Sequence, residues 1–204
     1  MAMIPKINLQ DISRSGHVTR WHSVRTLRNQ TLAEHHYMVS MFVNKMAKEI
    51  PVDPISDSER LLLIEYAMWH DTPELLMGDL ASPLKRRIEE ISKAENPIEI
   101  IENEIAPWLT NLKEKIKKKP ELYIIFKLAD MMDAIIFIFQ EGVGEHSKAV
   151  RKNLEDSFLK KVISGEMIKP SYNWKIAESM LHDLLHATTN QLEFEIKEDG
   201  TTSD

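Results

Sequence analysis

The chain has 204 residues and a net charge of −6, and its 43% hydrophobic and 28% charged residues are the balance of a soluble globular protein of one domain, or two at most. The acidic balance argues against a nucleic-acid partner, and the absence of any apolar run near ~18 residues argues against a membrane span. Because cysteine is absent and residues 1–10 lack the basic and apolar pattern of a secretory signal, we expect a cytoplasmic protein.

Helical signals run through the chain almost without interruption. Two capping boxes, Thr31 to Glu34 and Ser56 to Glu59, each precede an apolar-rich run. Prolines that a first helical turn tolerates are Pro73, Pro83, Pro97 and Pro120. Glycines that we expect to end helices are Gly78, Gly142 and Gly165. These signals predict helices over residues 31–50, 57–71, 73–77, 83–94, 97–118, 121–141, 145–164 and 171–192.

No alternating segment of strand type competes with these helices. Residues 135–139 are β-branched and aromatic, but they lie inside a longer run of helical period. Nothing in the chain resembles an interdomain linker. We therefore predict an all-α fold, a single compact helical bundle over residues 1–196, followed by a polar C-terminal tail over residues 197–204.

The first helix with candidate chemistry follows Thr31. His35 shares a stripe of this helix with Val39, Phe42 and Met46, which is the face expected to meet the core. The neighbouring His36 falls on the flank of that stripe. An imidazole that points inward is either a metal ligand or a hydrogen-bonded core residue, and the helical pattern leaves both open.

The next helix ends in a second candidate pair, His70 and Asp71, after an apolar run over residues 61–69. Adjacent side chains on a helix point about 100° apart, so the two reach one ion only near a helix end or bend. The following Thr72-Pro73 supplies such a bend. An imidazole nitrogen and a carboxylate oxygen together suit a divalent transition metal, although a His-Asp dipeptide alone is a weak signal.

A third candidate, Asp130, lies in a helix that is apolar on most sides. A carboxylate in such a setting is rarely buried unless it is paired or bound to a metal, so a functional role and a structural salt bridge are both open. Asp133 follows three residues later, near the same face. It either shares the site or caps a neighbouring helix.

Taken in order, His35, His70-Asp71 and Asp130 resemble the H…HD…D pattern of the HD phosphohydrolase superfamily. Flanking stretches strengthen the likeness to its small single-domain branch, the bacterial 5′-deoxynucleotidases and phage dATP triphosphohydrolases. These stretches are Arg20-Trp21, Ala33-Glu34-His35, His70-Asp71-Thr72-Pro73-Glu74 and Gly78-Asp79 through Ser82-Pro83 to Lys85. The likeness covers residues 10–140, and these four stretches together with Asp130 are five ordered motifs whose fitting spacing makes it specific.

The resemblance implies an HD-type phosphohydrolase domain over residues 1–196 that holds one divalent transition metal. Its implied ligands are His35, His70, Asp71 and Asp130. Two nitrogens with two carboxylates suit Mn²⁺, Co²⁺, Fe²⁺ or Zn²⁺ better than Mg²⁺, which prefers oxygen ligands. The resemblance also implies a homo-oligomer, a dimer or larger.

The resemblance further implies a catalytic acid or base, Glu74. Asp79 either works with Glu74 or holds the loop at Gly78. Arg20 and Lys85 are the implied phosphate contacts, since a guanidinium can bind phosphate in a bidentate manner. The remaining implied role is that of Trp21, which would line the sugar pocket and disfavour a 2′-hydroxyl.

The implied substrate is a 2′-deoxynucleotide, and two reactions share these motifs. One releases deoxynucleoside and triphosphate from a dNTP, with dATP as the phage precedent, and the other is a 5′-deoxynucleotidase that acts on monophosphates. We lean to the dATP triphosphohydrolase, because the stretches over residues 20–24 and 30–35 look more phage-like. A catalytically inactive nucleotide- or metal-sensing module is the alternative of another class, and the presence of Glu74 with all four implied ligands argues against it.

Overall fold

The two predicted capping boxes open the two helices that carry the histidine candidates. At the start of α2 (Leu32–Glu49), the Thr31 hydroxyl accepts a hydrogen bond from the Glu34 N–H, and the Glu34 carboxylate accepts one from the Thr31 N–H at 2.8 Å. Ser56 and Glu59 form the same reciprocal pair at the start of α3 (Asp57–Trp69). Each box satisfies amide donors that the first helical turn leaves unpaired, which fixes where each helix begins.

The computed structural model describes residues 6–92 and 95–186, and within them the chain is helical without any strand beyond two isolated bridges. This confirms the predicted all-α fold. The remaining helices are α1 (Leu9–Ser13), α4 (Glu74–Met77), α5 (Ser82–Ser92), α6 (Pro97–Ile105), α7 (Pro107–Lys117), α8 (Pro120–Glu141), α9 (Gly144–Ile168) and α10 (Lys175–His186). The predicted tail over 197–204 and the end of the predicted helix over 171–192 lie outside the described residues.

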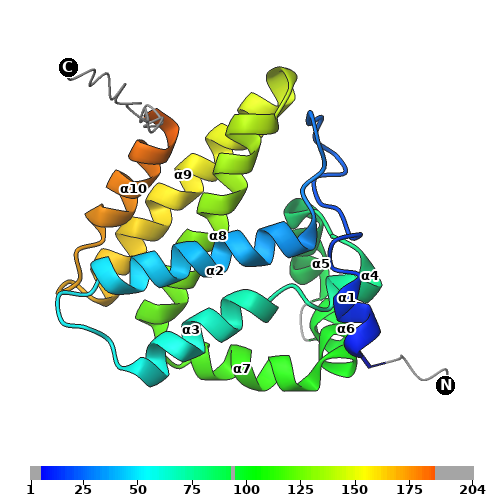
Figure 1. The fold of residues 1–204 in the computed structure, drawn as a ribbon, viewed down its shortest axis with the longest axis horizontal. Helices are drawn as coiled ribbons and strands as arrows, with labels where there is room; N and C mark the ends of the chain where they lie inside the picture. Colours follow the sequence, from blue (N-terminus) through cyan, green and yellow to red (C-terminus); the bar gives the residue numbers. More distant parts are fainter. Residues whose placement is uncertain (1–5, 93–94, 187–204) are drawn as a thin grey trace, which may run out of the picture.

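The long helix α8 is the centre of the fold. It packs against α2 on one side and α9 on the other, and α3, α7 and α10 also contact it (Figure 1). Almost every side chain from Leu122 to Ile138 is buried, so α8 is apolar nearly all round, as expected of a helix enclosed by others. The few polar groups on α8 are therefore exceptions that need partners.

The prediction of one helix over residues 97–118 is wrong. The chain breaks at Ala106, whose φ of −136° and ψ of 67° are not helical, and α7 begins at Pro107. A proline ring crowds the residue before it and disfavours the helical conformation there. Pro107 therefore ends α6 and opens α7, as the other prolines open their helices.

The expectation that Gly165 ends a helix is also wrong. Gly165 lies inside α9, and a β-carbon on it would stand 2.5 Å from Cδ2 of the Trp174 indole, which is fully buried. Because Gly165 has no side chain, the indole of Trp174, which lies between α9 and α10, can pack directly on the α9 backbone. Close packing, and not helix termination, accounts for this glycine.

A loop over residues 14–31 runs across the start of α2 and beside the end of α8 (Figure 1). Backbone hydrogen bonds fix it at several places: Leu27 N–H donates to Glu141 O at 2.8 Å, and Val143 N–H donates to Arg25 O at 2.9 Å. Within the loop, Arg20 N–H donates to Gln30 O at 2.9 Å. The loop is thereby fastened to the helices that carry the candidate site.

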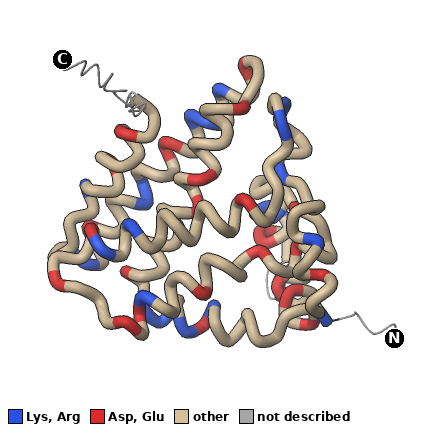
Figure 2. The backbone as a smooth tube through the Cα atoms, in the orientation of Figure 1, with Lys and Arg blue, Asp and Glu red and all other residues tan. Residues whose placement is uncertain are grey.

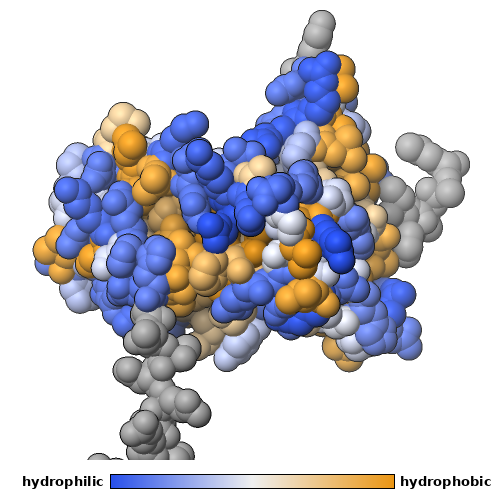
Figure 3. All heavy atoms as spheres, turned by 90° about the horizontal axis from the view of Figure 1, so that it is seen from above, coloured by the Kyte–Doolittle hydropathy of each residue, from blue (hydrophilic) through white to orange (hydrophobic). Residues whose placement is uncertain are grey.

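The surface of the described residues carries both signs of charge, and Figure 2 shows basic and acidic segments interspersed along α7 and α9. Apolar side chains also reach the surface, Met41 of α2 and Ile163 of α9 among them, and Figure 3 shows such apolar surface between polar regions. None of the described helices is long and apolar enough to cross a membrane. The predicted homo-oligomer stays a prediction.

Candidate functional site

Two imidazoles from different helices meet at the centre of the candidate site. His35 lies on the buried face of α2, and His70 is the residue at which α3 ends. Their Nε2 atoms are 3.2 Å apart. The apolar stripe predicted for α2 therefore carries His35 inward, and the end of α3 brings His70 to it.

The carboxylates of Asp71 and Asp130 complete this cluster. Asp71 Oδ2 lies 3.5 Å from His35 Nε2 and 3.3 Å from His70 Nε2. Asp130 Oδ1, from α8, lies 3.6 Å from His35 Nε2 and 3.9 Å from His70 Nε2. The end of α3 does provide the bend that lets adjacent side chains point to one place. All four residues predicted as ligands thus converge.

The hydrogen bonds made by the Nδ1 atoms of the two imidazoles determine whether their Nε2 atoms carry a proton or a lone pair. His35 Nδ1 lies 2.6 Å from Asp133 Oδ2, and His70 Nδ1 lies 2.9 Å from Ala67 O. Both partners are acceptors, so the neutral form of each ring carries its proton on Nδ1 and turns a lone pair of Nε2 inward. Two nitrogen lone pairs and two carboxylates then face one another. Such a donor set fits a divalent transition metal.

The second histidine of α2, His36, does not join this cluster. Its Nε2 is buried and has no hydrogen-bond partner in the described structure. Burial holds the pKa of His36 well below its usual value, which keeps the ring neutral. The prediction that His35, and not its neighbour, points at the other ligands agrees with this geometry.

Lys127 stands beside the Asp130 carboxylate, with Nζ 3.0 Å from Oδ2. Burial opposes ionisation of Asp130, but the pKa of the carboxyl is lowered, with the Lys127 ammonium as the largest favourable cause. Asp130 is therefore a carboxylate at neutral pH. Nothing in the sequence distinguishes Lys127, because a lysine three residues from an aspartate on a helix is usually a solvated surface pair.

Glu74 and Lys85 form an ion pair next to the cluster. Glu74 is the first residue of α4, its side chain is buried, and it contacts the Lys85 ammonium of α5. One oxygen of Glu74, Oε2, is buried without a hydrogen-bond partner. Burial and the nearby charge of Asp71 raise the pKa of Glu74, and Lys85 opposes that rise. A carboxyl with these neighbours is suited to exchanging a proton near neutral pH.

Asp79 contacts the loop over residues 14–31. Its Oδ2 accepts a hydrogen bond from the Trp21 N–H at 3.4 Å, and its Oδ1 lies 3.9 Å from Arg20 Nε. These contacts are with Arg20-Trp21, a segment that neither of the two roles left open for Asp79 included. The Asp79 charge also contributes to the raised pKa of Glu74, so both roles stay predictions.

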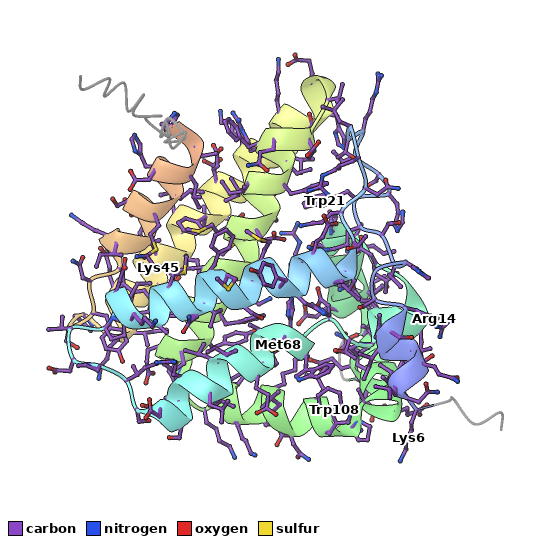
Figure 4. The ribbon with its side chains drawn as sticks, viewed as in Figure 1. Lys6, Arg14, Trp21, Lys45, Met68 and Trp108 are labelled. Carbon is purple, nitrogen blue, oxygen red and sulfur yellow. The ribbon has the colours of Figure 1, made fainter. Side chains whose placement is uncertain are left out.

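Trp21 has a strained backbone and a well-held ring. Its φ of 69° is in the left-handed region, where it is the single non-glycine residue among those described. The indole stacks on Phe137 of α8, with ring centroids 6.2 Å apart, and its Nε1 donates to Gln30 Oε1 at 2.8 Å. In Figure 4 the labelled Trp21 lies between the loop and α8. Strained residues of this kind cluster at functional sites.

A cavity of about 340 Å³ adjoins the ligand cluster. His70 and Asp71 line one end of it, and it extends between α3, α7 and α8. Tyr66 and Phe126 add aromatic surface, and Lys113 and Lys127 add ammonium groups. Glu99, Glu102 and Glu114 add carboxylates, whereas the predicted substrate contacts Arg20, Trp21 and Lys85 do not line this cavity.

Two comparisons relate the chain to known sequences. A family described as 5′-deoxynucleotidase YfbR-like matches residues 9–162. A dATP triphosphohydrolase of Acinetobacter phage SH-Ab 15497 is 30% identical over 191 residues, which cover 88% of this chain and 92% of the phage protein. A 5′-deoxynucleotidase of Vibrio cholerae is 27% identical over 172 residues, which cover 76% of this chain and 86% of that protein.

A solved structure has a similar fold. It is the HD phosphohydrolase DatZ of cyanophage S-2L, described as bound to dA and one catalytic Zn²⁺ ion. The two structures superpose with a TM-score of 0.75 at 21% sequence identity, and the match covers 91% of this chain and all of the cyanophage chain. The overall helical arrangement described above is therefore shared with an HD phosphohydrolase.

Proposed function

Because the chain belongs to the YfbR-like 5′-deoxynucleotidase family of HD phosphohydrolases, we propose that it hydrolyses 2′-deoxynucleotides at the site formed by α2, α3 and α8. The observation that carries this proposal is that ligand atoms of His35, His70 and Asp71 lie within 4.8 Å of one another, and that the Asp130 carboxylate approaches both imidazoles. Acceptors alone repel one another, so the cluster is suited to a cation between them.

The metal ion would be held by these four side chains. A divalent ion bound there supplies Lewis acidity toward a phosphate oxygen and lowers the pKa of water. The mixed nitrogen and oxygen set suits Mn²⁺, Co²⁺, Fe²⁺ or Zn²⁺. The Zn²⁺ ion named for the cyanophage structure supports this group of metals, and we propose Zn²⁺, Mn²⁺ or Co²⁺ as the first to test.

Glu74 would handle the proton of the attacking water. Its buried Oε2 has no partner among the described residues, so it retains an acceptor, and the raised pKa suits proton transfer near neutral pH. Lys85 holds the other carboxyl oxygen and would also meet a phosphate oxygen. Asp79 would act indirectly, because its contacts are with the Arg20-Trp21 segment.

Arg20 and Trp21 would select the substrate. The buried Nε of Arg20 makes no hydrogen bond in the described structure, which leaves a donor for a phosphate oxygen. Trp21, held by Phe137 and Gln30, would present a rigid wall to the sugar and exclude a 2′-hydroxyl. The indole can exclude a 2′-hydroxyl only if it does not move aside, and its contacts with Phe137 and Gln30 restrict its movement.

Of the two reactions, we favour conversion of dATP and water into deoxyadenosine and triphosphate. The phage relatives named dATP triphosphohydrolase support it. The alternative is a 5′-deoxynucleotidase, which the bacterial relatives support. An inactive sensing module is a weaker third possibility, because the candidate catalytic carboxyl is buried beside the ligand cluster.

The test is to incubate the purified protein with each deoxynucleoside mono-, di- and triphosphate and with ATP, in Mn²⁺, Co²⁺ or EDTA, and to separate the products by chromatography. Triphosphate and deoxyadenosine from dATP, with ATP spared, is the expected result. Orthophosphate from monophosphates alone would make the protein a 5′-deoxynucleotidase. Metal binding without any turnover would favour the sensing module.

A further inference from the structure

A buried chain of hydrogen bonds lies behind the ligand cluster and leads from His35 to Trp21. Asp133 Oδ2 lies 2.6 Å from His35 Nδ1 and accepts a second hydrogen bond from Gln30 Nε2 at 2.8 Å. The other end of the Gln30 amide, Oε1, accepts from Trp21 Nε1 at 2.8 Å. His35, Gln30 and Asp133 are all buried, with side chains that water does not reach.

The chemistry of the partners fixes the orientation of the Gln30 amide. The Asp133 carboxylate can only accept, so it requires the NH₂ end, and the indole N–H of Trp21 can only donate, so it requires the carbonyl end. Arg20 Nη1 adds a further donor to the carbonyl end at 3.3 Å and lies 3.5 Å from Asp133 Oδ2. Only a side chain with a donor at one end and an acceptor at the other satisfies both neighbours.

Each end of this series of hydrogen bonds positions one residue, His35 at one end and Trp21 at the other. At one end, the acceptor at Asp133 keeps the His35 proton on Nδ1, so that Nε2 faces the other three ligands. At the other end, the left-handed backbone of Trp21 is disfavoured for an L-residue and persists only where its surroundings hold it. The Gln30 carbonyl is one of the contacts that hold it.

We propose that Asp133 and Gln30 are positioning residues that link metal binding to sugar selection. Asp133 sets the tautomer and ring orientation of His35, and Gln30 joins that carboxylate to the indole of Trp21. Disturbing Gln30 therefore weakens metal binding and sugar selection together. The sugar half of this inference rests on the proposed function, whereas the metal half depends only on the ligand cluster.

The metal half is tested by titrating metal-free protein with Co²⁺ and following visible absorption. Asp133→Asn is expected to bind Co²⁺ about 10–100-fold more weakly, as is usual when the partner of a ligating histidine is lost. Asp156→Asn, an exposed change on α9, is the matched control and should match wild type. Long-range ¹H–¹⁵N NMR of the imidazoles gives a separate readout: the proton of His35 should leave Nδ1 in part of the Asp133→Asn molecules.

The link itself is tested with Gln30→Met, which keeps the length of the side chain and removes both polar ends. We expect about fivefold weaker Co²⁺ binding, the effect of one lost hydrogen bond, and a fall of similar size in the dATP to ATP rate ratio. Gln140→Met, an exposed glutamine on α8, is the control. Trp21→Phe, which removes the indole N–H, should lower the rate ratio and leave Co²⁺ affinity within about twofold of wild type.

The outcomes separate the two halves. Wild-type Co²⁺ affinity in a folded Asp133→Asn protein with an unchanged His35 tautomer would overturn the proposal for Asp133. Loss of sugar selection alone in Gln30→Met would overturn the link. If Asp133→Asn does not fold, judged by circular dichroism, Gln30→Met decides the metal half. If wild type hydrolyses no deoxynucleotide, the proposed function fails, and the Co²⁺ titrations still decide the role of Asp133.

Discussion

Lys119 Nζ lies 2.7 Å from Glu59 Oε1, which ties the first turn of α3 to the turn between α7 and α8. The same glutamate accepts two hydrogen bonds from Ser56, so one carboxylate both caps a helix and joins two helices that are distant in sequence. Lys119 and these capping bonds lower the pKa of Glu59 from 4.5 to about 2.

The low pKa predicts an acid-dependent loss of stability. Because the pKa of Glu59 is lower in the folded state than in the unfolded state, its contribution is complete above about pH 4.5 and disappears as the pH falls toward 2. Glu59→Gln should therefore lower the free energy of unfolding at pH 7 by about 1 kcal/mol, a value reduced by the partial exposure of the pair. Urea unfolding at pH 7 and pH 3 measures it, and the difference from wild type should shrink at pH 3. Glu104→Gln, an exposed change, should show no such trend.

Gly165→Ala should destabilise the protein through the Trp174 contact. The new β-carbon would lie 2.5 Å from the indole, so the ring or the backbone of α9 has to move, at a cost of about 1–3 kcal/mol. Helix propensity alone predicts the opposite sign. Gly16→Ala, where a β-carbon meets open space, is the control in thermal unfolding experiments. Equal or higher stability of Gly165→Ala would contradict the packing described here.

Removing a proposed metal ligand should abolish both binding and turnover. His70→Ala takes one of the two nitrogens from the cluster, and we expect hydrolysis to fall at least 100-fold with loss of the Co²⁺ absorption band. His146→Ala, an exposed histidine on α9, should change neither. Hydrolysis that persists in a His70→Ala protein free of bound metal would remove the cluster from the mechanism.

Glu74→Gln should separate chemistry from metal binding. The amide keeps the shape of the side chain but cannot exchange the proton, so kcat should fall by about 10²–10⁴. Co²⁺ affinity should stay within about twofold of wild type, since Glu74 is not among the converging ligands. Steady-state kinetics with dATP and the Co²⁺ titration measure the two effects, with the exposed Glu89→Gln as control. A matching loss of metal affinity would make Glu74 a ligand instead.

Trp21→Ala should relax sugar selection. Without the indole wall, the rate with ATP should rise relative to dATP, and we expect the ratio of kcat/KM values for the two substrates to change at least tenfold. Trp108→Ala is the control, because that indole stacks edge-on against Trp69 on the far side of α3 (Figure 4). An unchanged ratio would show that another residue excludes the 2′-hydroxyl.

The sequence was sufficient where local patterns determine structure. The capping boxes at Thr31 and Ser56 located α2 and α3, and the apolar stripe of α2 selected His35 over His36. Both follow from short-range hydrogen bonding and helical period. The break at Pro107 was missed because the apolar period continues through it, although the crowding that a proline imposes on Ala106 was available from the sequence.

Long-range pairings were out of reach of the sequence. Gln30 precedes a capping box and has no periodic neighbour, yet it contacts Asp133, which is 103 residues away. The sequence did not decide whether Asp133 shares the site or caps a helix, because its contact with His35 depends on how α2 crosses α8. Gly165 was expected to end a helix because the sequence does not show which ring will lie on it. Such pairings arise from tertiary packing, which no local pattern encodes.

The loop over residues 14–31 has a consequence for how this enzyme family can change. The proposed metal ligands all come from α2, from the end of α3 and from α8, whereas Arg20, Trp21 and Gln30 all come from one fastened loop. With the roles proposed for Arg20 and Trp21, mutations of these two residues would alter which nucleotide is accepted and leave the proposed ligands unchanged. Of the three residues, Gln30 also contacts Asp133, the partner of the proposed ligand His35. Substitutions that change the substrate should therefore be most constrained at Gln30.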